Sequence, residues 1–163
     1  MVMHIWTLKN WKEYYDLNDV THRSGLYLRF DKEVEPEVKR ACKEFGKWLR
    51  KNYFFPIKIP IYFKETEFIK ALDGDLVSAT FFEPYDKTVE PYIRIATGDY
   101  IKLLNKSGKN NALGSVLYSM AHGLTHYFQW INDIHLTSIG QERQATVYAG
   151  YIIDEYKKTR KHP

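Results

Sequence analysis

Residues 115–130 constrain this chain more than any other stretch, because they carry two histidines four positions apart in an apolar run with helical period. On an α-helix, residues i and i+4 lie one above the other, about 5–6 Å apart, so His122 and His126 project side by side. Two imidazoles placed in this way can bind one metal ion. Six histidines in 163 residues give such a pair by chance roughly one time in five. The surrounding pattern therefore has to support the pair.

Apolar and polar residues around the histidines separate onto two stripes of the expected helix. The apolar stripe consists of Leu113, Val116, Leu117, Met120, Ala121, Leu124 and Phe128. The polar stripe consists of Ser115, Ser119, His122, His126 and Gln129. Such a division is typical of a helix that buries one face and leaves the other accessible. The sequence thus predicts a helix over about residues 110–130 with its histidines turned toward a cleft.

A second helical run over about residues 141–158 supplies a candidate for a third metal ligand. Glu142 opens this run, and Ala145 and Ala149 are small enough to let the two helices approach closely. The alternative is that Glu142 only complements the helix dipole in the first turn. His135, nine residues after His126, is a rival for the third ligand position.

The five residues from His122 to His126 resemble the H-E-x-x-H motif of zinc peptidases, with Gly123 at the place of the glutamate. Downstream, Glu142 and Ala145 resemble the E-x-x-A pattern of the gluzincins, in which the glutamate is the third zinc ligand. The run from Ala145 onward is similar to the corresponding stretch of the ImmA/IrrE peptidases. This resemblance covers the last third of the chain and the order of the strands before it.

The resemblance implies Zn²⁺ held by His122, His126 and Glu142, and hydrolysis of a peptide or protein substrate through a metal-activated water. It also implies an extended substrate that pairs with a sheet edge. Candidates for a group that supports the ligands or the oxyanion are Thr146, Tyr148 and His135. The general base of the family would stand at position 123. The chain is therefore expected to be inactive or impaired by two or more powers of ten.

Two interpretations of Gly123 stay open. Glycine costs roughly 0.8–1 kcal/mol against alanine in a helix interior, so helix formation does not favour it. In one interpretation Gly123 is a substitution in an otherwise active zinc metallopeptidase. In the other, the chain is a natural pseudopeptidase that uses the same cleft as a peptide- or protein-binding module.

The rest of the chain predicts an α+β fold with a small twisted sheet of three to four strands, zincin-like by resemblance. Strands are expected at residues 25–30, 57–63, 77–82 and 92–96, helices at 35–53 and 99–104, and a loop at 107–111. Pro60 indicates that its strand lies at a sheet edge or carries a bulge. Residues 77–82 are favoured over 92–96 as the edge that pairs with substrate. Residues 1–163 are expected to form one domain, in which residues 1–24 are a possible peripheral arm.

Composition limits the other classes of function. The one cysteine, Cys42, cannot form an internal disulfide, and no apolar run is long enough for a secretory signal or a membrane span, so a cytoplasmic protein without a membrane partner is expected. The net charge of +4 is spread out except for a basic tail at residues 157–161. This tail favours a solvated helix end over nucleic-acid contact. The sequence does not define an oligomeric state.

Overall fold

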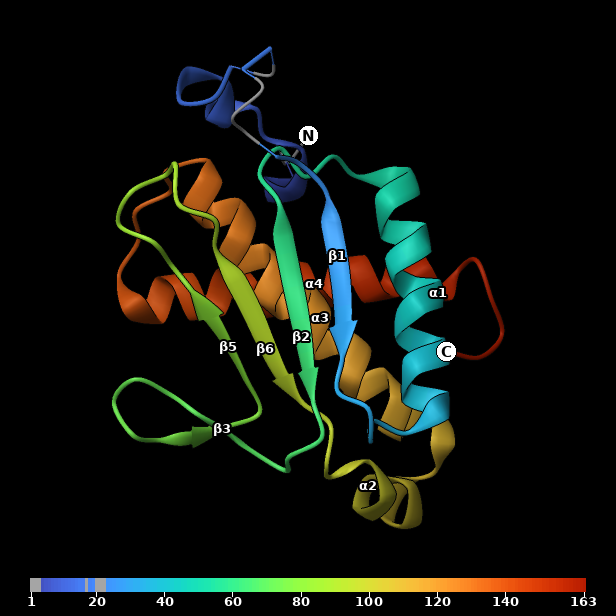
Figure 1. The fold of residues 1–163 in the computed structure, drawn as a ribbon. Coiled ribbons are helices and arrows are strands. Elements are labelled where there is room, and N and C mark those ends of the chain that lie inside the picture. Colours follow the sequence, from blue (N-terminus) through green and yellow to red (C-terminus); the bar gives the residue numbers. More distant parts are fainter. Residues whose placement is uncertain (1–3, 17, 20–22) are drawn as a thin grey trace.

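A four-stranded mixed sheet with helices packed against it forms the fold in the computed structural model, which describes residues 4–16, 18–19 and 23–163 (Figure 1). The strand order is β1-β2-β6-β5. Three neighbouring strands run parallel, namely β1 (Leu26–Phe30), β2 (Ile59–Lys64) and β6 (Tyr92–Ala96). At one edge, β5 (Ala79–Phe82) pairs antiparallel with β6, while β3 (Ile69–Lys70) and β4 (Leu76–Val77) form a separate two-stranded sheet. The predicted α+β class is confirmed.

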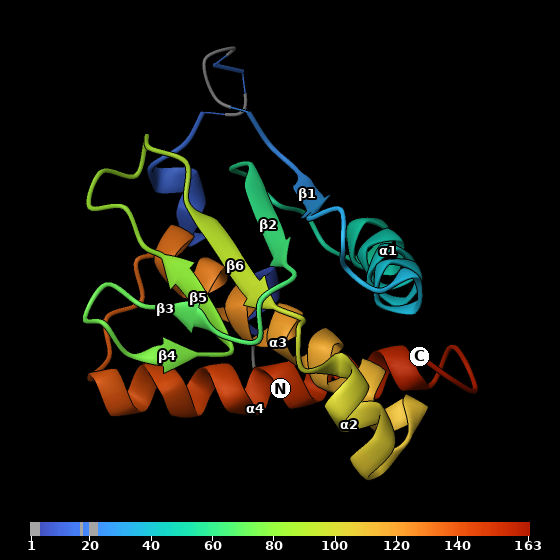
Figure 2. The same cartoon turned by 60° about the horizontal axis from the view of Figure 1, so that its bottom comes forward.

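The described residues form four α-helices on one side of this sheet or beside it, namely α1 (Pro36–Asn52), α2 (Tyr100–Ser107), α3 (Lys109–Ile131) and α4 (Ser138–Lys157). Figure 2 shows α3 beneath the sheet and α4 crossing α3. The apolar residues of α3 are buried because this helix packs against β5 and β6, α1 and α4 together. Within the part of the chain that the structure describes, no helix combines the length and apolar character needed to span a membrane.

The junction between α2 and α3 differs from the sequence prediction, which placed a loop at residues 107–111. Only Gly108 separates the two helices, at a φ of 86° that favours glycine. Its N–H donates to the Leu104 carbonyl and its own carbonyl accepts from the Ala112 N–H, both at 3.0 Å. The Asn111 side-chain amide also donates to the Ser107 carbonyl at 2.9 Å. Polar residues that favour loops by composition therefore bridge two helices here.

Pro60 does not mark an edge strand or a bulge, because β2 lies between β1 and β6. The N–H of Ile59 points toward β1 and donates to the Gly25 carbonyl. The backbone nitrogen of Pro60 points toward β6, but the pairing with β6 begins only at Ile61. A proline at this level loses no ladder hydrogen bond, so an internal strand accommodates it.

In the described part of residues 1–24, a few apolar and aromatic side chains reach the core, while most of the other residues are exposed. Ile5 and Trp6 are each 2% exposed. The indole N–H of Trp6 donates to the Thr125 hydroxyl of α3 at 2.9 Å, and the Trp11 backbone N–H donates to the Asn132 side chain at 3.1 Å. Aromatic rings in a polar stretch supply this burial. Residues 1–3, 17 and 20–22 lie outside the described part.

Candidate metal centre

Helix α3 carries both histidines on one face, one turn apart, with their ring centroids separated by 4.9 Å. Helix α4 brings Glu142 to them from across the interface. This helix begins where the Thr137 side chain accepts a hydrogen bond from the Gly140 N–H, which caps its first turn. Ala145 and Ala149 are fully buried, and their small side chains allow a close approach of the two helices. The predicted pairing of the histidine helix with the glutamate helix is thus present.

The three side chains converge on one point. One donor atom each from His122, His126 and Glu142 lies within 4.8 Å of the others. The Nε2 atom of His122 is 3.1 Å from one carboxylate oxygen of Glu142, and that of His126 is 2.9 Å from the other oxygen. Ligands bound to zinc at about 2.0–2.1 Å in a tetrahedral site are about 3.3–3.4 Å apart. The two distances between imidazole and carboxylate are close to this spacing, while the group as a whole extends to 4.8 Å.

Gln129 fixes the tautomer of His126. Its amide nitrogen donates to the Gln141 carbonyl at 3.0 Å and to the Gln144 side chain at 2.9 Å, so its oxygen faces Nδ1 of His126 at 2.8 Å. An amide oxygen only accepts, so Nδ1 carries the proton and a neutral ring has a lone pair at Nε2. That lone pair faces the Glu142 carboxylate. Two acceptors at this distance repel each other unless a proton or a cation lies between them.

His122 is held in the neutral form that binds metals. Burial lowers the pKa of its imidazole, the neighbouring His126 lowers it further, and Glu142 opposes the change. Its Nδ1 atom is buried and has no hydrogen-bond partner among the described residues. Two imidazoles and a carboxylate are a donor set that suits zinc. The residues present therefore fit the ion that the sequence predicted.

The three side chains border a cleft of about 500 Å³ whose opposite wall is β5. Ala79, Thr80 and Phe81 of this strand and Glu83 just after its end line the cleft. The Phe81 ring is stacked over His126, with centroids 6.4 Å apart. Because β5 is the edge of the four-stranded sheet and β6 is internal, only the first of the two strands considered from sequence can offer a free edge beside the histidines.

Gly123 lies in this cleft at the point where α3 packs on β6. A Cβ atom added at this position would be 3.1 Å from both Cδ1 and Cγ2 of Ile93, and 3.4 Å from Cγ1. These distances are shorter than normal van der Waals contacts, so any side chain here requires Ile93 to shift. The close approach of helix and strand gives the glycine a packing role that the sequence did not reveal.

The three remaining candidates from sequence lie outside this cleft. His135 is in the loop between α3 and α4, largely exposed, and pairs with Asp133 at 2.8 Å. Tyr148 packs its ring 4.8 Å from that of His4, because six helical residues after Glu142 the chain faces a different side of α4. Thr146 is exposed, and its backbone carbonyl accepts a 3.4 Å hydrogen bond from the hydroxyl of Tyr118.

Gln129 is the residue whose role sequence reasoning missed, although it was placed on the polar stripe. Its position three residues after His126, on the same helix face, was the available signal.

Comparisons of the chain with protein-family models, with curated proteins and with solved structures find no match. The resemblance to gluzincins and to the ImmA/IrrE peptidases stays a prediction.

Proposed function

We propose that this chain is a zinc metallopeptidase scaffold that binds Zn²⁺ through His122, His126 and Glu142. The observation that carries the proposal is the convergence of these three side chains, from two helices, within 4.8 Å at the border of a cleft. When bound, zinc supplies Lewis-acid activation of a water molecule for peptide hydrolysis. A cytoplasmic location is part of the proposal, because Cys42 is a buried free thiol whose pKa burial raises, as in an inert core residue.

The residues around the cleft have distinct tasks in this proposal. Gln129 orients the His126 ring so that Nε2 faces the ligand position. The free edge of β5 offers backbone N–H and carbonyl groups to an extended peptide, which would then run beside the histidines. Phe81 connects the edge strand with the metal site, since it belongs to β5 and packs on the His126 ring.

Position 123 supplies no group that accepts a proton, so hydrolysis by the chain as it stands is expected to be absent or strongly impaired. Glu83 is the second carboxylate that lines the cleft, next to the end of β5. Glu83→Gln is therefore the first variant to examine if the unmodified chain hydrolyses peptides. Loss of that activity with retention of zinc binding would assign the proton acceptor to Glu83.

A second candidate function is a natural pseudopeptidase that binds a peptide or protein without cleaving it. The packing at Gly123 favours this alternative, because Ile93 occupies the space that a glutamate Cβ would need. In this case the cleft, the edge strand and the zinc ion would together form a binding surface. Metal content does not distinguish the two functions, so a test of catalysis is required.

The metal site is tested by titrating the metal-free protein with zinc and following the heat of binding. One zinc ion per chain is expected. His122→Ala and His126→Ala should each weaken binding strongly, because each removes one of three protein ligands. His135→Ala is the matched control, since this histidine lies outside the cluster, and its zinc affinity should equal that of the unmodified chain. Equal affinity in all four proteins would overturn the proposed ligand set.

Catalysis is tested with the double variant Gly123→Glu/Ile93→Val. The valine removes the Cδ1 atom that crowds position 123, and the glutamate restores the proton acceptor. We expect cleavage of casein or of an unstructured peptide mixture that disappears when His126→Ala is added. If the double variant is folded and binds zinc but cleaves none of these substrates, the peptidase proposal fails and the binding module remains.

A further inference from the structure

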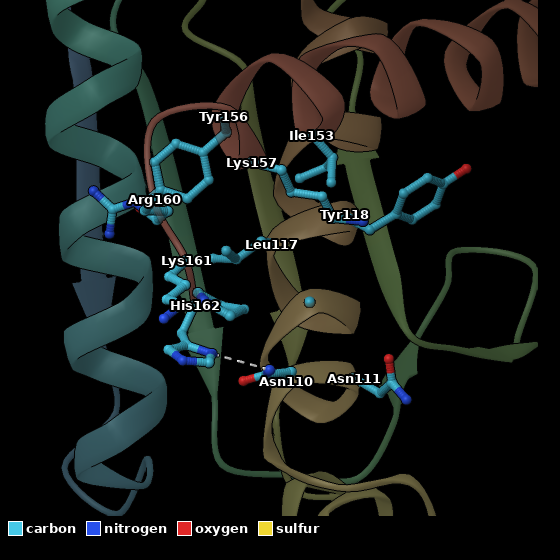
Figure 3. A pocket seen from close by; sticks show the side chains of 12 residues that line it. Asn110, Asn111, Leu117, Tyr118, Ile153, Tyr156, Lys157, Arg160, Lys161 and His162 are labelled. Carbon is cyan, nitrogen blue, oxygen red and sulfur yellow. Dashed lines mark hydrogen bonds between the residues drawn. The ribbon is translucent and has the colours of Figure 1, made fainter.

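A second cavity, of about 460 Å³, lies beside the first turns of α3 and shares no lining residue with the cleft at the proposed zinc site. Its walls come from α3, from the end of α4 and from the tail after α4, which runs between α1 and α3 (Figure 3). Gly114 lies in its α3 wall, eight residues and thus about 12 Å along the helix from His122. The volume falls within the range of roughly 300–1,000 Å³ that is typical of small-molecule sites.

The basic tail forms part of this cavity. The carbonyl of Pro163 accepts a 3.0 Å hydrogen bond from Arg40 of α1, and Arg160 pairs with Glu44 at 2.7 Å. His162 lies 3.2 Å from the side-chain nitrogen of Asn110, at the start of α3. These contacts place the tail beside the cavity, while Lys157, Lys158 and Lys161 stay exposed at and after the end of α4, as the sequence led us to expect.

The charge of the lining favours an anion. Lys157, Arg160, Lys161 and His162 all line the cavity, and none of the described lining residues is acidic. Glu44 compensates Arg160, but neither Lys157 nor Lys161 has an ion-pair partner among the described residues. Positive charge that is gathered around a concave site without compensation attracts anions from solution.

Hydrogen-bond donors in the cavity also lack partners. Tyr156 is 2% exposed, yet its hydroxyl has no hydrogen-bond partner among the described residues. Burial raises the pKa of this hydroxyl to about 12, so it stays a neutral donor. The Nε atom of Arg160 is likewise buried and unpaired within the described chain, while its guanidinium packs 4.3 Å from the Tyr156 ring. A buried donor without a partner is costly, so these two groups are unsatisfied polar atoms of residues that line the cavity.

The first turns of α3 border the same space. Asn110 and Asn111 belong to the first turn and line the cavity. Gly114, Leu117 and Tyr118 follow on the same flank of the helix, so the cavity runs along α3.

The remainder of the lining is apolar. Leu117 and Ile153 form the inner wall, with the rings of Tyr118 and Tyr156 beside them (Figure 3). A free inorganic ion would leave this surface unused. We propose that the cavity binds a small phosphate ester with an aromatic body, whose phosphate contacts the basic side chains and whose ring packs on the apolar wall. Stacking of a planar ring on tyrosine supplies the second part of the affinity.

The proposal is tested by calorimetric titration of the full chain with three probes, namely AMP, adenosine and inorganic phosphate. AMP should saturate one site per chain. Adenosine and phosphate should each bind at least about tenfold more weakly, since each lacks half of the contacts. Equal binding of AMP and phosphate would show a site for the ion alone and would refute the aromatic part of the proposal. No saturable binding of any probe at millimolar concentration would overturn it entirely.

Matched variants locate the site. Gly114→Leu should abolish AMP binding, because a side chain at this position enters open space within the cavity wall. Gly150→Leu is its control, since Gly150 also faces open space in a helix but does not line the cavity. A loss of AMP binding in both variants, or in neither, would contradict the assignment.

The role of charge is tested separately by substituting two pairs of lysines. These variants also test the proposal if Gly114→Leu does not fold. Lys157→Gln/Lys161→Gln should weaken AMP binding at least about tenfold. Lys47→Gln/Lys51→Gln removes the same charge from exposed positions of α1 outside the lining and should leave the affinity unchanged. An equal loss in both pairs would show only a general effect of net charge and would refute a specific site.

Discussion

Replacement of Gly123 by alanine tests whether the glycine is present for packing. In an exposed helix interior this change would stabilise the protein by roughly 0.8–1 kcal/mol. At position 123, however, the new methyl group would lie 3.1 Å from two carbon atoms of Ile93. Over-packing of this kind costs roughly 1–3 kcal/mol. The free energy of unfolding of Gly123→Ala is therefore expected to fall, by up to about 2 kcal/mol.

A double-mutant cycle with Ile93→Val isolates the contact. The valine lacks the Cδ1 atom, which is one of the two carbons at 3.1 Å. Gly123→Ala should thus be less destabilising in the Ile93→Val background than in the unmodified chain, with a coupling of at least about 0.5 kcal/mol. The measurement is equilibrium urea unfolding followed by far-UV circular dichroism, performed on the metal-free protein so that zinc affinity does not contribute.

Gly150→Ala is the control, because an added Cβ at that position of α4 meets no atom within 4 Å. It should give the full helical gain of roughly 0.8–1 kcal/mol. If Gly123→Ala gives the same gain and shows no coupling to Ile93, the close approach of α3 to β6 does not explain the glycine. The argument that packing favours a natural pseudopeptidase would then be lost.

Three further changes test other contacts. Thr125→Val should lower the free energy of unfolding by roughly 1–3 kcal/mol, measured by urea unfolding, because the buried indole N–H of Trp6 loses its acceptor. Gln129→Ala should weaken zinc binding roughly 10–100-fold in a competition titration with a chromophoric chelator, because the imidazole loses the partner that orients it. Hydrogen bonds, first of all from Arg40, lower the pKa of Glu37 from 4.5 to about 2. The contribution of the Glu37 carboxylate to the free energy of unfolding is therefore complete above pH 4.5 and is lost as the pH falls toward 2. Thermal unfolding at several pH values should show the difference between the unmodified chain and Glu37→Gln shrinking across that window, and a constant difference would contradict the pairing.

Much of the local structure could be predicted because it depends on residues close in sequence. The apolar period placed α1, α3 and α4 to within a few residues, and alternation placed β1 and β6. The loop predicted at residues 107–111 failed because Gly108 adopts a positive φ that lets one helix follow another directly. Residues that favour loops by propensity are compatible with helix ends when their side chains bond to the backbone, as Asn111 does.

For the candidate site, the sequence identified the possible metal ligands but not all of the residues that contact them. The i, i+4 spacing of His122 and His126 fixes their neighbourhood on any α-helix, so this part needed no tertiary information. The tertiary structure selected Glu142 over His135 as the group that meets them, since that choice depends on how α4 crosses α3. It also placed the Tyr148 ring against His4, on another side of α4.

By itself, the sequence determined most of the helices and strands and the pair of imidazoles, because these follow from periodicity and from covalent spacing along one chain; it missed β3 and did not separate β4 from β5. Only the tertiary structure decided that β2 is internal despite Pro60, that β5 is the free edge, and that Gly123 lies against Ile93. The position of the basic tail beside a cavity along α3 is likewise seen only in the tertiary structure. The reason is physical: contacts between distant segments depend on the distance and angle at which elements pack, and no local pattern encodes these.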